Sequence, residues 1–207
     1  MEPGTVRNER LTATTSVVLV ALLLVEGVTI LFLRPLLPVH IFVGMLLIPP
    51  VVLKLVTTGY RFVRYYTGHA GYVDRGAPKL PLRVLAPVLV AATVVLFSTG
   101  VALLLLGPGD QWMVGLHKAS FIVWFGVTAI HVLAHAAKVP RQAAADWRAR
   151  SRLPGGSARR LVVALSVVAG LALGAAALTI DGPWVHRHHH HREALAAPFA
   201  RSRGWVE

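Results

Sequence analysis

Five long apolar stretches constrain the fold of this chain more than any other feature of its sequence. Each is long enough to cross the roughly 30 Å hydrocarbon core of a bilayer as a helix. The stretches are residues 12–33, 39–58, 84–106, 116–137 and 160–180. Hydrophobic residues make up 55% of the 207 residues and charged residues 14%, which excludes an ordinary soluble domain. We therefore expect an all-α integral membrane bundle of five transmembrane helices.

The connections between the spans are too short for a separate soluble domain. The expected divisions are a four-helix membrane core (1–138), a basic cytoplasmic loop (139–159), a fifth span (160–181) and a histidine-rich external tail without fixed structure (182–207). The first apolar stretch exceeds the core of a typical signal peptide, and no small-residue cleavage site follows it before Arg34 and Pro35. We expect it to remain in the membrane.

Basic residues alternate between the connections and indicate the topology. The second and fourth connections hold Arg61, Arg64, Arg75, Lys79, Arg83, Lys138, Arg141, Arg148, Arg150, Arg152, Arg159 and Arg160, against few acids. Because cytoplasmic loops are enriched in Lys and Arg, this pattern places the amino terminus inside and the carboxyl terminus outside. The net charge of +12 is thus explained by topology and anionic lipid rather than by nucleic acid. The expected location is a bacterial cytoplasmic membrane.

Two histidines lie fourteen residues apart inside the fourth span, His117 and His131. On a helix this interval puts both imidazoles on one side, about 21 Å apart along the axis. The second span repeats the interval with His40 and Lys54. Polar side chains at this depth are costly, so each is a candidate for a functional site.

The two spans that begin with His40 and His117 should enter the membrane from the same side. Their imidazoles would then lie at matched depth on two helices, as the two axial ligands of a b-type haem require. The chain has no cysteine, which excludes iron–sulfur clusters, thiolate ligands and covalent c-type haem. A haem b between His40 and His117, with His131 at a possible second, inner haem, is the leading hypothesis.

The segments PVHIFVGMLL around His40 and LHKASFIVWFGVTAIHVLAH from Leu116 to His135 resemble the transmembrane dihaem cytochromes b. These include the cytochrome b subunits of formate dehydrogenase and nickel–iron hydrogenase, and bacterial b561-type proteins. The resemblance covers roughly residues 10–138 and implies His40 and His117 as ligands of the outer haem iron, with His131 on the inner haem. It also implies electron exchange with quinone and with a separate cofactor-bearing oxidoreductase subunit, so that the chain would be an electron-transfer subunit rather than a complete enzyme.

The chain departs from that family at the second ligand of the inner haem. The family usually supplies it from the cytoplasmic end of the first span, where Leu11 to Val20 contain no histidine. Lys54 lies at the correct depth and is a candidate if deprotonated. It is equally a candidate partner for a propionate, and a five-coordinate inner haem or no inner haem are the other possibilities. His135 cannot serve, because residues four apart share one side of a helix.

Several polar residues have an ordinary explanation beside the functional one. Arg61 and Arg64 are candidates for binding haem propionates, but also fit the cytoplasmic charge pattern. Glu26 is a candidate proton or quinone site, or a glutamate paired with a buried serine or with Arg34. His135 fits a simple helix contact. The tail histidines, His186 and His188–His191, fit weak metal binding or a low-complexity tract.

Two other function classes compete with the cytochrome. One is a transition-metal or small-solute transporter that uses the intramembrane histidines, and the other is a structural or assembly subunit. A visible haem spectrum separates the cytochrome from both. Small residues Ser98, Thr99 and Gly100 in the third span, and Gly170 and Gly174 in the fifth, indicate where helices approach closely.

Overall fold

The computed structural model describes residues 3–74, 76, 80–107, 109–136, 139, 141, 144, 155–180 and 184. This part of the chain is helical and contains no strand. Its long helices are α1 (Pro3–Leu31), α2 (Leu33–Tyr66), α4 (Leu80–Leu106), α5 (Gln111–His135) and α7 (Gly156–Ala177), and α3 (Ala70–Val73) is a single turn. All five long helices have the length and composition to cross a membrane. The predicted all-α bundle with five spans is confirmed.

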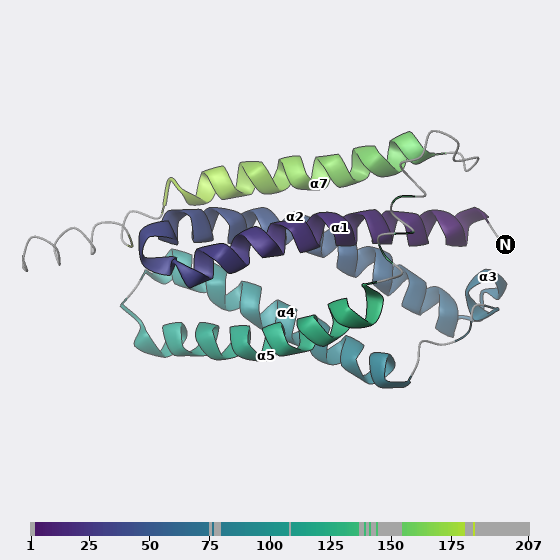
Figure 1. The fold of residues 1–207 in the computed structure, drawn as a ribbon, viewed down its shortest axis with the longest axis horizontal. Helices are drawn as coiled ribbons and strands as arrows, with labels where there is room; N and C mark the ends of the chain where they lie inside the picture. Colours follow the sequence, from purple (N-terminus) through teal and green to yellow (C-terminus); the bar gives the residue numbers. More distant parts are fainter. Residues whose placement is uncertain are drawn as a thin grey trace, which may run out of the picture.

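The five helices lie side by side with alternating direction (Figure 1). Helices α1 and α7 both pack along α2, while α4 packs along α5. The α1–α2 and α4–α5 connections and the end of α7 lie at one end of the bundle, and α3, the amino terminus and the start of α7 at the other (Figure 1). Helices α2 and α5 therefore run in the same direction, as predicted from the two spans that carry the histidines.

Helix α7 packs closely against α2 of the predicted four-helix core. A side chain built at Gly170 would place its Cβ 2.3 Å from the backbone oxygen of Leu46, and one at Gly174 would lie 2.8 Å from the oxygen of Phe42. Only glycine allows two helix backbones to approach so closely. The small residues predicted as a packing face thus hold α7 directly against α2.

The helix boundaries differ from the apolar stretches most at α1, which begins at Pro3 rather than near residue 12, and at α2, which extends to Tyr66 rather than ending near residue 58. Tyrosines and arginines favour the polar edge of a membrane, and a helix can continue through that layer. The chain reverses near Phe32, between α1 and α2, and Leu36 has non-helical backbone angles (φ −107°, ψ 16°). Pro49 and Pro50 lie inside α2, which continues past them with helical backbone angles.

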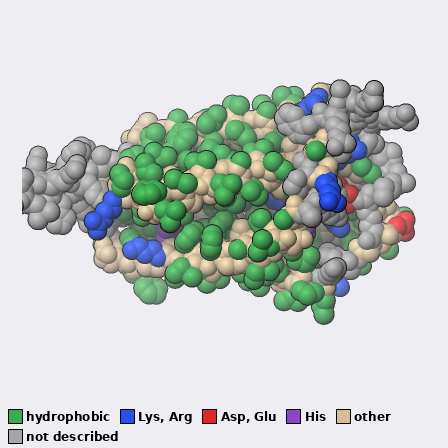
Figure 2. All heavy atoms as spheres, in the orientation of Figure 1, with side chains coloured by type: hydrophobic (Ala, Val, Ile, Leu, Met, Phe, Trp, Pro, Cys, Tyr) green, Lys and Arg blue, Asp and Glu red, His purple; other side chains and the backbone are tan. Residues whose placement is uncertain are grey.

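The outer surface of the bundle is apolar along its middle (Figure 2). Large hydrophobic side chains on the lipid-accessible faces are exposed, including Leu24, Val56, Ile122, Phe125 and Leu165. The described Lys and Arg side chains visible in this view lie mostly toward the two ends (Figure 2). An apolar belt between polar ends is typical of a multi-pass membrane protein in contact with lipid.

Candidate cofactor site

A cavity of about 260 Å³ lies between α1 and α2 on one side and α4 and α5 on the other. Its walls are almost entirely apolar, with side chains such as Ile41, Leu47, Phe97 and Phe121. Four of the side chains that line the cavity are ionisable: those of Glu26, His40, His117 and Lys118. An apolar cavity with a few convergent polar groups is the usual form of a cofactor site.

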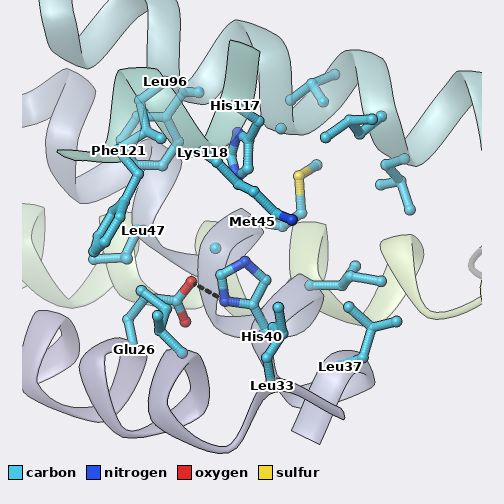
Figure 3. A pocket seen from close by; sticks show the side chains of 18 of the residues that line it. Glu26, Leu33, Leu37, His40, Met45, Leu47, Leu96, His117, Lys118 and Phe121 are labelled. Atoms are coloured by element: carbon cyan, nitrogen blue, oxygen red, sulfur yellow. Dashed lines mark ion pairs between the residues drawn. The ribbon is translucent and has the colours of Figure 1, made fainter. Parts of the chain in front are cut away.

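His40 and His117 enter this cavity from opposite walls and point toward one another (Figure 3). His40 comes from the first turns of α2 and His117 from the second turn of α5. Because these helices are parallel, the two residues lie at the same level of the bundle. The structure therefore brings the two predicted histidines to opposite walls of one cavity.

His40 is anchored by α1. Its Nδ1 lies 2.7 Å from Oε1 of Glu26 (Figure 3) and 3.2 Å from the hydroxyl of Thr29. The same hydroxyl lies 3.1 Å from the second carboxylate oxygen of Glu26. Glu26 is 8% exposed, so this carboxylate is held by its partners rather than by water. Its partners are thus His40 and Thr29, rather than the buried serine or Arg34 expected as the ordinary alternative for this residue.

His117 is anchored by α4. Its Nδ1 lies 3.0 Å from the hydroxyl of Thr99, which is also 2.9 Å from the carbonyl of Val95 in its own helix. A Cβ on Gly100 would lie 3.2 Å from Cε1 of His117, so the glycine leaves room for the imidazole ring. The small residues predicted in this span therefore position a candidate ligand.

In both rings Nδ1 makes the hydrogen bond to a neighbouring helix. Nε2 of each imidazole is thereby left for a ligand in the cavity. An outward hydrogen bond of this kind fixes the tautomer and the orientation of a metal-binding histidine. The two histidines are held in the same way, one by a carboxylate and one by a hydroxyl.

Two tryptophans line the cavity near its two ends. The indole nitrogen of Trp124 donates to the hydroxyl of Thr93 at 3.0 Å, which joins α5 to α4 inside the bundle. The indole nitrogen of Trp184 donates to the carbonyl of Leu103 at 3.1 Å, near the carboxyl end of α4. Trp184 follows α7 in the chain and lines the cavity beside the carboxyl end of α4.

The candidates for an inner haem do not form a comparable site. The imidazoles of His131 and His135 stack on one another with ring centres 4.6 Å apart, and His135 Nδ1 bonds the carbonyl of His131. The ammonium of Lys54 donates to the hydroxyl of Ser16 at 2.5 Å and to the carbonyl of Thr12 at 3.3 Å. Lys54 is therefore engaged with α1. Its hydrogen bonds join two helices, a role that the sequence did not indicate.

Arg61 and Arg64 lie in the last turns of α2, far from the cavity. Twenty-one residues separate His40 from Arg61, which corresponds to about 32 Å along a helix. The guanidinium of Arg64 lies 5.8 Å from the ring centre of Tyr60. Neither arginine can reach a propionate of a haem at His40 and His117, and both fit the polar edge of the membrane.

The sequence did not identify Thr29, Lys118 and Trp184 as residues of this site, and it indicated Thr99 only as a small residue at a helix contact. Thr29 lies three residues after Glu26, and Lys118 directly follows His117, so both had a local signal. Trp184 had none, because it lies in the predicted tail. The tail histidines and most of the basic loop after His135 lie outside the described residues.

No cluster of three or more His, Cys, Asp or Glu side chains that could hold a metal ion occurs in the described part of the chain. Two imidazoles facing one another suit a metal whose other ligands come with a macrocycle. Comparison of the chain with protein-family models, with curated proteins and with solved structures gives no match.

Proposed function

We propose that this chain is a membrane b-type cytochrome that holds one haem between His40 and His117. The observation that carries the proposal is the pair of imidazoles pointing toward one another across an apolar cavity, each with Nδ1 already engaged (Figure 3). The resemblance of the surrounding segments to dihaem cytochromes b supports the same assignment.

The residues around the cavity fit a porphyrin. Two histidine nitrogens are the axial ligands of many b-type haems, and an apolar wall suits the face of the macrocycle. Glycines at positions 44 and 100 keep side-chain bulk out of the space beside Glu26 and His117. Lys118 would supply a positive charge for a carboxylate. When bound, haem would supply a one-electron redox couple inside the membrane.

The chain's own residues would set the position of the haem in the bundle and its exposure to water. His40 and His117 would hold the iron at one level of the bundle. Leu47, Phe97 and Phe121 would exclude water from the cavity, and a dry site strengthens the electrostatic effect of nearby groups.

Electrons would pass between the quinone pool and a partner redox protein. The helices carry little mass outside the membrane, so a separate cofactor-bearing subunit is the expected partner. The basic residues at the end of α2 support a cytoplasmic location for that end, and a bacterial cytoplasmic membrane remains the proposed compartment. His131 and Lys54 are not assigned a haem in this proposal.

The test is the haem content of the purified chain, measured by pyridine haemochrome and by reduced-minus-oxidised spectra. We expect one haem b per chain. His40→Ala and His117→Ala should each lose most of it, whereas His135→Ala, a histidine of α5 that bonds within its own helix, should retain it. A colourless wild-type protein, or equal haem content in all three variants, would overturn the proposal.

A transporter would give a different result in the same preparation. It predicts metal-dependent flux in vesicles by a protein without haem absorption. No contact among the described residues favours that alternative.

A further inference from the structure

Glu26 is an acidic side chain within a membrane span, and its burial calls for a specific role. It is 8% exposed and lies on α1, while the imidazole that it contacts belongs to α2. Its Oε1 is 2.7 Å from His40 Nδ1, within hydrogen-bonding distance (Figure 3). A carboxylate costs much free energy to bury, so it persists only where its partners compensate.

Thr29 fixes the position of that carboxylate. Its hydroxyl lies 2.7 Å from the backbone carbonyl of Glu26, 3.1 Å from Oε2 and 3.2 Å from His40 Nδ1. The hydroxyl therefore bridges the acid and the imidazole. Such a network holds Oε1 beside Nδ1 of His40 and restricts rotation of the carboxylate.

The second imidazole has a neutral partner. His117 Nδ1 lies 3.0 Å from the Thr99 hydroxyl, whose oxygen is also 2.9 Å from the carbonyls of Val95 and Leu96. The hydroxyl hydrogen is directed to its own helix, so its oxygen can accept from His117. The two imidazoles thus have hydrogen-bond partners of different charge. His40 contacts a carboxylate, whereas His117 contacts a neutral hydroxyl.

We propose that Glu26 sets the reduction potential of the haem by making His40 the more electron-rich of its two axial ligands. This inference rests on the proposed function. A carboxylate that accepts the Nδ1–H bond gives the ring partial imidazolate character, which favours the ferric over the ferrous iron. The apolar surroundings strengthen the effect because they do not screen the charge. Glu26 acts through His40 and is a positioning residue.

The direct test is Glu26→Gln, which keeps the size of the side chain and an oxygen that accepts from Nδ1, but removes the charge. At a fixed ambient potential, we expect the ratio of reduced to oxidised haem to rise at least tenfold in an equilibrium titration of the haem-loaded protein. For a one-electron couple this is an increase of about 59 mV in midpoint potential. Asp74→Asn removes a carboxylate outside the cavity and is the matched control, which should shift the ratio by less than threefold.

A second variant and a measurement on the unaltered protein keep the inference testable if Glu26→Gln does not assemble. Glu26→Asp retains the charge one methylene further away, so its ratio should lie between those of the wild type and the neutral variant. In the wild-type ferric protein, electron–nuclear double resonance should resolve two inequivalent axial imidazoles.

The outcomes separate this inference from the proposed function. A wild-type protein that binds no haem overturns the proposed function and the inference with it. A protein that binds haem through both histidines, but whose potential is the same with glutamate and glutamine, overturns the inference alone. Equivalent axial imidazoles in the wild type would also overturn it.

Discussion

Gly170→Ala should separate α7 from α2, and the size of the separation follows from the structure. The added Cβ would lie 2.3 Å from the backbone oxygen of Leu46, whereas ordinary contacts begin near 3.4 Å. The obstacle is backbone rather than the end of a flexible side chain. The two helices therefore have to move apart by about 1.1 Å at this point.

The expected cost comes from two opposing effects. Overpacking of this kind costs about 1–3 kcal/mol, while replacement of a helical glycine by alanine gains at most about 1 kcal/mol. With a gain of about 1 kcal/mol, we expect a net loss of about 0–2 kcal/mol in the free energy of unfolding. Gly126→Ala on α5 is the matched control, because its Cβ would meet nothing within 4 Å. That variant should be as stable as the wild type or slightly more stable.

The assay is reversible unfolding in mixed detergent micelles, followed by far-ultraviolet circular dichroism. The two alanine variants should differ from one another by about 1–3 kcal/mol, with Gly170→Ala the less stable. Equal stability of both variants would refute the close packing of α7 on α2. Leu46 belongs to the helix that carries His40, so a separation at this point also acts on the candidate site.

Three further changes test other contacts. Thr93→Val leaves the buried indole nitrogen of Trp124 without its acceptor, and should lower the free energy of unfolding by about 1–3 kcal/mol in the same assay. Thr67→Val at an exposed site is the control and should change the free energy of unfolding by less than about 0.5 kcal/mol. Lys54→Met should leave the haem content at one per chain, because Lys54 bonds α1; loss of haem would contradict that placement. Trp184→Phe removes the hydrogen bond to the carbonyl of Leu103 beside the cavity, which is worth about 0.5–1.5 kcal/mol. Haem transfer to apomyoglobin should therefore be about two- to tenfold faster. An unchanged transfer rate would show that this bond does not retain the haem.

The number and direction of the membrane helices could be predicted from the sequence because hydropathy depends on composition along one segment. The shared level of His40 and His117 followed from the same information, since two parallel spans that each begin with a histidine place both at one depth. Each of these conclusions needs only distances along a helix axis. None needs the rotation of a helix about that axis.

The contacts of the candidate site depend on that rotation, which tertiary packing sets. Lys54 has the depth expected of a ligand partner for His131, yet its ammonium bonds Ser16 and Thr12 of α1. Glu26 reaches His40 because α1 packs along α2 at this level. Sequence spacing gave the depths of these side chains but could not show which neighbouring helix each would contact.

The position of Trp184 could not be predicted for a different reason. Its sequence context predicted an external tail, and the composition of a tail does not show whether one of its residues packs against the helix bundle. A hydrogen bond to the end of α4 fixes it against the cavity.

The central claim is that imidazoles from α2 and α5 ligate the same iron. Near-infrared magnetic circular dichroism of the ferric protein tests it most directly, because the charge-transfer band reports both axial ligands at once. We predict a low-spin haem with two imidazole ligands in the wild type, and loss of that signal in both His40→Ala and His117→Ala. A wild-type haem with one imidazole, or two-imidazole ligation that persists in either variant, would contradict the account.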